Sequence, residues 1–307
     1  MKKTIGIIGL VGLFLISFLV FLYLTFPYEV LKETVSVELS GKTGYNIQIG
    51  ELKPRLPLGI QAMNVHIDLK DGAKGLHFNK VIADISIFSL FIGSISTELE
   101  LDSGGGQLDL EIDISISDLI AGTPFPNDVT LEAKRFPIDD LISFALNTAE
   151  DGSNSMVGLL KNIGLSAKLD GTAAIDLNKN NPTQSSGAIN LKLNDALLIL
   201  SNPMVGLEDQ AFKKAEIRAK VESGRVVIDK TSQFISNDLD IGFGGRVDLK
   251  SNLAQSQLNL EASIKLGGEI QKVFGWVIGS ATKDPARDSE CTIRVNGLMS
   301  QPNTTIF

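Results

Sequence analysis

The chain has 307 residues, of which 43% are hydrophobic but only 6% aromatic, and its formal net charge is −8. The acidic balance argues against nucleic-acid binding, which requires a basic footprint. The single cysteine, Cys291, excludes an intramolecular disulfide, and two histidines are too few to suggest a zinc cluster.

The amino terminus carries a long apolar run. Residues 5–26, from Ile5 to Phe26, contain no charge, and at about 1.5 Å per residue they match a hydrocarbon core of roughly 30 Å. Lys2 and Lys3 precede the run, so the positive-inside rule places tail residues 1–4 in the cytoplasm. The alternative is a cleaved signal peptide, but the run exceeds the usual h-region of about 7–15 residues and no small-x-small cleavage site follows. We therefore predict a single-pass anchor in a bacterial inner membrane, with the bulk of the chain in the periplasm.

Residues 27–44 show a helical period. Tyr28, Leu31, Val35 and Leu39 form one stripe, and Gly41 or Gly44 would end the helix. Because this amphipathic helix follows the anchor directly, we expect it to lie close to the membrane surface.

From residue 45 to residue 307 the period changes to two. The clearest case is QLDLEIDISIS at 107–117, where acidic or hydroxyl residues alternate with aliphatic ones. In a strand this pattern makes one face aliphatic. Gly104, Gly105 and Gly106 precede the segment and predict a hairpin with ISTELELD. The aliphatic residues are Leu108, Leu110, Ile112, Ile114 and Ile116.

The same alternation recurs nearly to the end of the chain, for example in HFNKVIADISIF, LSAKLDGTAAIDL, AEIRAKV and LNLEASIKL. Short helices are expected in FPIDDLISFALNTA, MVGLLKNIG and EIQKVFGWVIGSA, with Trp276 on the core face of the last one. Three short helices cannot cover more than ten strands. The predicted fold is therefore mainly β: an elongated, curved, mostly antiparallel sheet with a few short helices, either as one body or as two lobes split near 147–160.

No catalytic constellation is recognisable. The sequence has no G-x-S-x-G, H-E-x-x-H or P-loop motif. Asp139 and Asp140 are interpreted as capping the helix that follows, His66 and His77 as solvated sheet positions, and Cys291 as a buried strand thiol. We predict no catalytic residue, no cofactor and no metal.

Several segments together resemble a known family: GYNIQIGELKPRLPLGIQAMNVHI after the anchor, ESGRVVIDKTSQFISNDLDIGFGGRVDLKSNLAQSQLNLEASIKL in the second half, and TIRVNGLMSQPNTTIF at the end. The chain is similar to the type II secretion system protein N family, in the form found in Leptospira- and Geobacter-like bacteria, and more distantly to AsmA-like periplasmic proteins. The first resemblance implies an accessory subunit of a secretion apparatus. The second implies curved sheets with an aliphatic groove, a shape associated with lipid transfer.

Two functions follow, and both use the alternating strands. In the first, the periplasmic sheet is a structural subunit that binds other secretion-system subunits. In the second, the aliphatic face holds phospholipid acyl chains, each buried CH₂ contributing about 0.8 kcal/mol. An enzyme is the third and weakest alternative. Twelve stacked strands would reach only about 60 Å, which is short for a lipid conduit across a periplasm and favours the secretion subunit.

Overall fold

A computed structural model describes residues 27–69, 75–123, 125–148, 164–200, 208–282 and 288–307, together with Phe21 and Thr25. The predicted anchor at 5–26, apart from those two residues, lies outside the described residues. So does the helix expected in MVGLLKNIG, except its final Gly164. Within the described ranges, no helix combines the length and the apolar character needed to cross a membrane.

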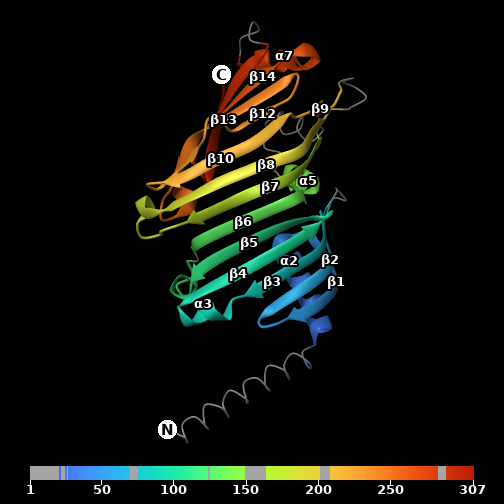
Figure 1. Cartoon of the computed structure of the whole chain (residues 1–307), viewed down its shortest axis with the longest axis vertical. Helices are drawn as coiled ribbons and strands as arrows, with labels where there is room; N and C mark the ends of the chain where they lie inside the picture. Colours follow the sequence, from blue (N-terminus) through green and yellow to red (C-terminus); the bar gives the residue numbers. More distant parts are fainter. Residues whose placement is uncertain are drawn as a thin grey trace, which may run out of the picture.

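The fold is one large antiparallel sheet (Figure 1). The sheet has 16 strands, and most of them pair with the next strand along the sequence. This arrangement confirms the predicted mainly β class, with a long antiparallel sheet and few short helices. The strands are β1 Asn46–Arg55, β2 Gly59–Asp68, β3 Leu76–Ile85, β4 Ser94–Ser103, β5 Gly106–Ser115, β6 Pro126–Pro137, β7 Gly164–Asp176, β8 Ser186–Ile199, β9 Gln210–Ala211, β10 Lys214–Glu222, β11 Arg225–Ile228, β12 Gln233–Ile235, β13 Leu239–Asp248, β14 Gln257–Leu266, β15 Glu290–Leu298 and β16 Gln301–Ile306.

The described helices connect or flank these strands. They are α2 Tyr28–Thr43, α3 Ile87–Phe91, α4 Ile116–Ile120, α5 Asp139–Thr148 and α7 Gly268–Thr282, with 3-10 turns η1 Pro182–Gln184 and η2 Leu253–Gln255. Gly44 ends α2 with φ 79°, in the left-handed region that glycine adopts without steric cost, which confirms the expected helix end.

The predicted hairpin is present as β4 and β5. Gly104 and Gly105 form its turn with φ values of 56° and 78°. Two successive positive φ values match the turn type whose twist suits a two-residue hairpin. The register pairs Leu99 with Leu110 and Leu101 with Leu108, so the aliphatic side chains of both strands share one face.

Two expected strand ends are wrong. Ile116 begins α4 instead of continuing β5, and Ile87 begins α3 instead of continuing β3. Strand β4 starts at Ser94, opposite Ser115, so no β4 backbone is left to pair beyond that point. The amide of Ile116 donates instead to the Gly93 carbonyl, 3.0 Å away. Pro137 ends β6, and α5 begins two residues later at Asp139.

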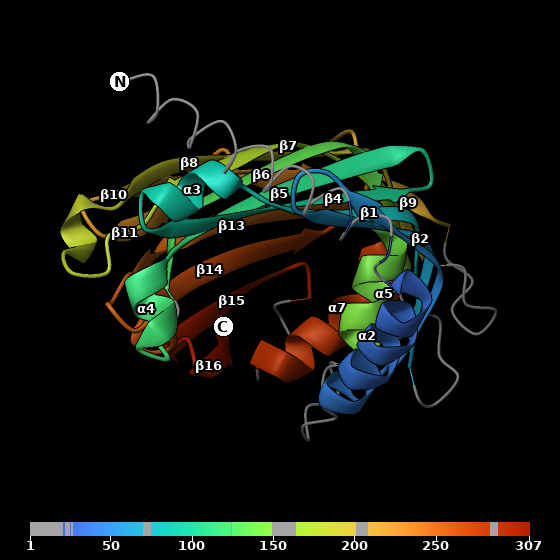
Figure 2. The same cartoon turned by 90° about the horizontal axis from the view of Figure 1, so that it is seen from below.

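The sheet is curved, and helices α2, α5 and α7 lie on its concave side (Figure 2). Bulges shift the register between Ala133 and Phe136 in β6, and between Ser166 and Lys168 in the pairing of β7 with β8. Bulges of this kind increase the local bend and twist of a sheet.

The core lies under the three helices. Leu141 and Ile142 of α5 and Leu31 of α2 pack against a buried cluster that also contacts Leu101 and Leu108. The aliphatic side of β4 and β5 is therefore the concave side. A second cluster places Ile270 and Ile278 of α7 against strand residues such as Leu239 and Leu266.

The two lobes considered from sequence meet within one sheet. Strands β6 and β7, which precede and follow residues 147–160, pair with each other from Asp128↔Asp176 to Pro137↔Lys168. The hydrogen-bonded ladder therefore continues across this position.

Candidate functional site

The aliphatic face continues across the sheet in rows of cross-strand partners. Leu99, Leu110 and Leu131 form one row in β4, β5 and β6. Ile112, Val129 and Ile175 form the next row in β5, β6 and β7. Of the predicted face residues, Leu108, Leu110, Ile112 and Ile114 therefore lie together, whereas Ile116 belongs to α4.

Part of this face is fully covered. Beneath and beside α5, the strand residues are tightly buried: Phe136 is 1% exposed, Ala133 and Ala167 are 3% exposed, and Ala196 is 2% exposed. The small alanines let the helix approach the strands closely. This part of the face is core.

A second part of the face is not covered in this way. We call it the uncovered strip: half-buried apolar side chains that point to the concave side and belong to neither core cluster. They come from strands between β4 and β14, so the strip runs across the strands. Its members include Leu99, Leu110, Ile112, Val129, Ile175, Ile189, Leu191, Val226, Val247, Leu258 and Leu260.

The chemistry of the uncovered strip is that of hydrocarbon. Each of these side chains is aliphatic and has no hydrogen-bonding group. Thr97, which pairs with Ile112, adds a hydroxyl on the same face. Such a surface can bind apolar chains by removing them from water, and it does not constrain their register or head group.

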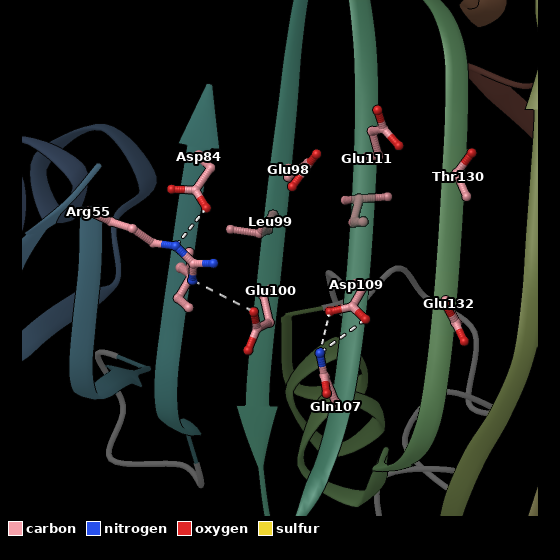
Figure 3. A pocket seen from close by; sticks show the side chains of 12 residues that line it. Arg55, Asp84, Glu98, Leu99, Glu100, Gln107, Asp109, Glu111, Thr130 and Glu132 are labelled. Atoms are coloured by element: carbon pink, nitrogen blue, oxygen red, sulfur yellow. Dashed lines mark hydrogen bonds and ion pairs between the residues drawn. The ribbon is translucent and has the colours of Figure 1, made fainter. Parts of the chain in front are cut away.

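The opposite face is acidic (Figure 3). Glu98 faces Glu111 across β4 and β5, and Glu100 faces Asp109. These side chains line a hollow of about 340 Å³ together with Arg55, whose Nε lies 3.0 Å from Asp84 Oδ2. Like charges directly opposite one another destabilise a sheet, so these carboxylates favour solubility, while Ile82, the partner of Glu100 on this face, is buried.

Asp128 shows the effect of this crowding. It pairs with Asp113 on one side and Asp176 on the other. Desolvation, followed by the charges of Asp176, Asp113 and Glu111, raises the pKa of the Asp128 carboxyl above its ordinary value of 3.8.

The described residues include no group of three or more His, Cys, Asp or Glu side chains arranged to hold a metal ion. His66 and His77 are nevertheless cross-strand partners in β2 and β3, and their rings stack with centroids 4.3 Å apart. The sequence could not reveal this pairing, because it depends on the register of two strands joined by a loop. Two imidazoles without a third ligand are a stacking pair.

Asp139 has a different role from the predicted one. Its Oδ1 accepts from the Ala167 amide and its Oδ2 from the Ser166 hydroxyl, each at 2.9 Å, so it attaches α5 to β7. Asp139 and Asp140 do lie in the first turn of α5, where carboxylates suit the helix dipole.

Cys291 lies half-buried in β15 against the α7 cluster, and burial raises the pKa of its thiol. The raised pKa disfavours the nucleophilic thiolate. The predicted position of Trp276 on the core face of its helix is wrong, because its side chain is 69% exposed. The core positions of α7 are Ile270 and Ile278 instead, which puts Trp276 on the outer side of the helix.

Comparisons with protein-family models, with curated proteins and with solved structures find no match to this chain.

Proposed function

We propose that the protein is a membrane-anchored component of a bacterial cell envelope whose uncovered strip binds lipid acyl chains. One observation carries the proposal: the concave face presents half-buried aliphatic side chains that neither core cluster includes. A structural core would bury them, as it buries Phe136 and Ala133 under the helices.

The length of the uncovered strip suits extended acyl chains better than compact ligands. The strip extends from β4 to β14 along the stacking direction. At about 4.8 Å per strand this is roughly 40 Å, enough for extended hydrocarbon chains. Each CH₂ removed from water contributes about 0.8 kcal/mol, so affinity grows with chain length and not with head-group contacts.

The predicted anchor at residues 5–26 supports the same function. It would hold the strip beside a bilayer, which is the source of acyl chains. The acidic convex face, with residues such as Glu98 and Glu111, would remain in water.

The test uses one substitution on each face of the sheet. Ile112→Asp places a carboxylate within the strip, whereas Asn190→Asp places one on the exposed opposite face in β8, where the cross-strand partner is Arg218. The full chain is purified from membranes in mild detergent, and phospholipid that co-purifies is measured by mass spectrometry. We expect wild type and Asn190→Asp to retain phospholipid and Ile112→Asp to lose it while remaining folded by circular dichroism.

Two outcomes would contradict the proposal. Wild-type protein free of phospholipid would remove its basis. An Ile112→Asp chain that fails to fold would instead identify the strip as core, because an unpaired charge cannot be buried cheaply.

A second candidate function is an accessory subunit of a type II secretion system, and it is favoured by the last strand. Among the described strands, β16 pairs with β15 alone, and most of its residues are exposed. An open edge of this kind can accept a strand from a partner subunit. Thr304→Pro introduces a residue without an amide hydrogen into β16, and should trap a secreted enzyme in the periplasm as gene deletion does. Normal export by the deletion strain would exclude this candidate.

A further inference from the structure

An exposed apolar surface lies along one row of strand ends, in the connections β1–β2, β3–β4 and β5–β6. Phe88 and Phe91 of α3 are 84% and 83% exposed, Ile92 after α3 is 81% exposed, and Ile120 of α4 is 82% exposed. Leu119 and Leu56 add further apolar area. We call this surface the edge patch and define it as Leu56, Phe88, Phe91, Ile92, Leu119 and Ile120.

Backbone hydrogen bonds join the three segments of the edge patch. The Ile85 amide, just before α3, donates to the Leu58 carbonyl in the β1–β2 turn at 2.8 Å. The Ile116 amide at the start of α4 donates to the Gly93 carbonyl at 3.0 Å. These bonds hold the three segments at the same ends of the strands, with α3 on the outer side of the curved sheet and α4 toward its concave side, away from helices α2, α5 and α7 (Figure 2).

Helix α3 has its polar side turned inward. Ser89 is only 7% exposed, its hydroxyl donates to the Ser86 carbonyl at 2.7 Å, and it accepts from the Ser96 amide at 3.0 Å. These bonds fix the helix on the sheet, so Phe88 and Phe91 must project away from it. A helix on a water-facing surface normally has the reverse arrangement.

The edge patch also avoids unpaired charge. Residues 85–97 contain no charged side chain. In α4, Asp118 Oδ1 lies 2.9 Å from Lys179 Nζ, and Arg55 beside Leu56 pairs with Asp84. A surface of this composition loses little hydration energy when it enters an apolar medium.

The position of the start of α2, where the folded part of the chain follows the predicted anchor, indicates what the edge patch contacts. The start of α2, which directly follows the apolar run at residues 5–26, lies at the same lower end of the molecule as α3 (Figure 1). A bilayer that holds the run would therefore come next to Phe88 and Phe91.

We propose that the edge patch inserts into the surface of a phospholipid bilayer and orients these strand ends on it. Amphipathic surfaces that lie in the interface bury their apolar side chains about 5–10 Å into the head-group region. This docking is separate from acyl-chain binding, because it uses the ends of the strands and not the uncovered strip.

The single tryptophan of the chain allows a direct test. Trp276 lies on α7, at the far end of the molecule from α3 (Figure 1). Phe88→Trp in a Trp276→Phe background moves the only tryptophan into the edge patch, and Ile120→Trp in the same background is an independent second reporter. The full chains are incorporated into phosphatidylcholine vesicles, with or without bromine on the acyl chains, and isolated by flotation.

We expect brominated lipid to quench the emission of both patch reporters, Phe88→Trp and Ile120→Trp, several-fold. In unbrominated vesicles the emission maximum of both reporters should lie at shorter wavelength than it does without vesicles. Wild-type Trp276, 69% exposed and distant, should emit alike in both kinds of vesicle.

Equal emission of the patch reporters in both kinds of vesicle, or chains that do not float, would overturn docking. So would a concentration-dependent blue shift without vesicles, which would identify a second copy as the partner. Adding Ile112→Asp to the Phe88→Trp reporter should leave its quenching unchanged, so loss of bound phospholipid and loss of docking are distinguishable.

Discussion

At the scale of single residues, the environment decides the role of each ionisable group. Asp139 and Asp128 are both strand-proximal aspartates, yet the first accepts two hydrogen bonds and the second faces two other aspartates. Cys291 is a thiol whose burial raises its pKa. None of these differences follows from residue type.

Asp128 provides a prediction with a defined pH dependence. Because its pKa in the folded protein lies above 3.8, ionisation costs the folded state free energy, and this cost is lost as pH falls below that value. Asp128→Asn should therefore raise the urea midpoint near neutral pH and have little effect at pH below 3.8. Asp240→Asn is the control, since Asp240 faces Lys265 and its neutralisation removes an opposite-charge pair. A lower midpoint for Asp128→Asn near neutral pH would refute the prediction.

At the scale of elements, each helix is placed by a few specific contacts. Helix α5 packs Leu141, Ile142 and Phe144 into the core, and Asp139 ties its first turn to β7. Helix α3 is fixed through Ser89. In both helices, which connect two strands, the polar contact therefore determines whether the apolar side chains face the core, as in α5, or the solvent, as in α3.

The α5 attachment predicts a measurable loss of stability. Asp139→Ala leaves the amide of Ala167, a residue only 3% exposed, without its acceptor. We expect the free energy of unfolding to fall by about 1–3 kcal/mol, the usual cost of an unsatisfied buried group. Asp139→Asn keeps one acceptor oxygen and should retain most of the stability in urea unfolding. Equal losses for the two variants would show that charge, and not the hydrogen bond, holds the helix.

At the scale of the whole molecule, one sheet separates two environments. The concave side is aliphatic and partly covered by helices, and the convex side carries facing carboxylates such as Glu98 and Glu111. With lipid on the strip and the edge patch on a bilayer, the proposed assembly keeps every charged strand face in water.

Topology gives a prediction for the complete chain. If residues 5–26 span the inner membrane with Lys2 and Lys3 in the cytoplasm, everything from α2 onward is periplasmic. Proteinase added to spheroplasts should then digest the chain, while the same treatment of intact cells should leave it whole. A chain that survives in spheroplasts, detected with an antibody to its carboxyl end, would reverse the predicted orientation.

The sequence by itself determined the class of fold and the two faces of the sheet. Alternation fixes which side chains share a side of a strand, as in Leu108 to Ile114, and paired glycines at 104 and 105 fix the hairpin. These signals are local, because backbone geometry sets the period of two. The helix end at Gly44 is local for the same reason.

Only the tertiary structure decided what covers the aliphatic face and where its strands stop. Ile87 and Ile116 continue the alternation but begin helices; for Ile116 the reason is that β4 begins opposite Ser115 and offers no further backbone to pair with. The stacked pair His66 and His77, and the exposure of Trp276, likewise depend on register and packing. Periodicity states which way a side chain points, whereas its burial depends on residues distant in sequence, and that is why the uncovered strip and the edge patch emerge only in three dimensions.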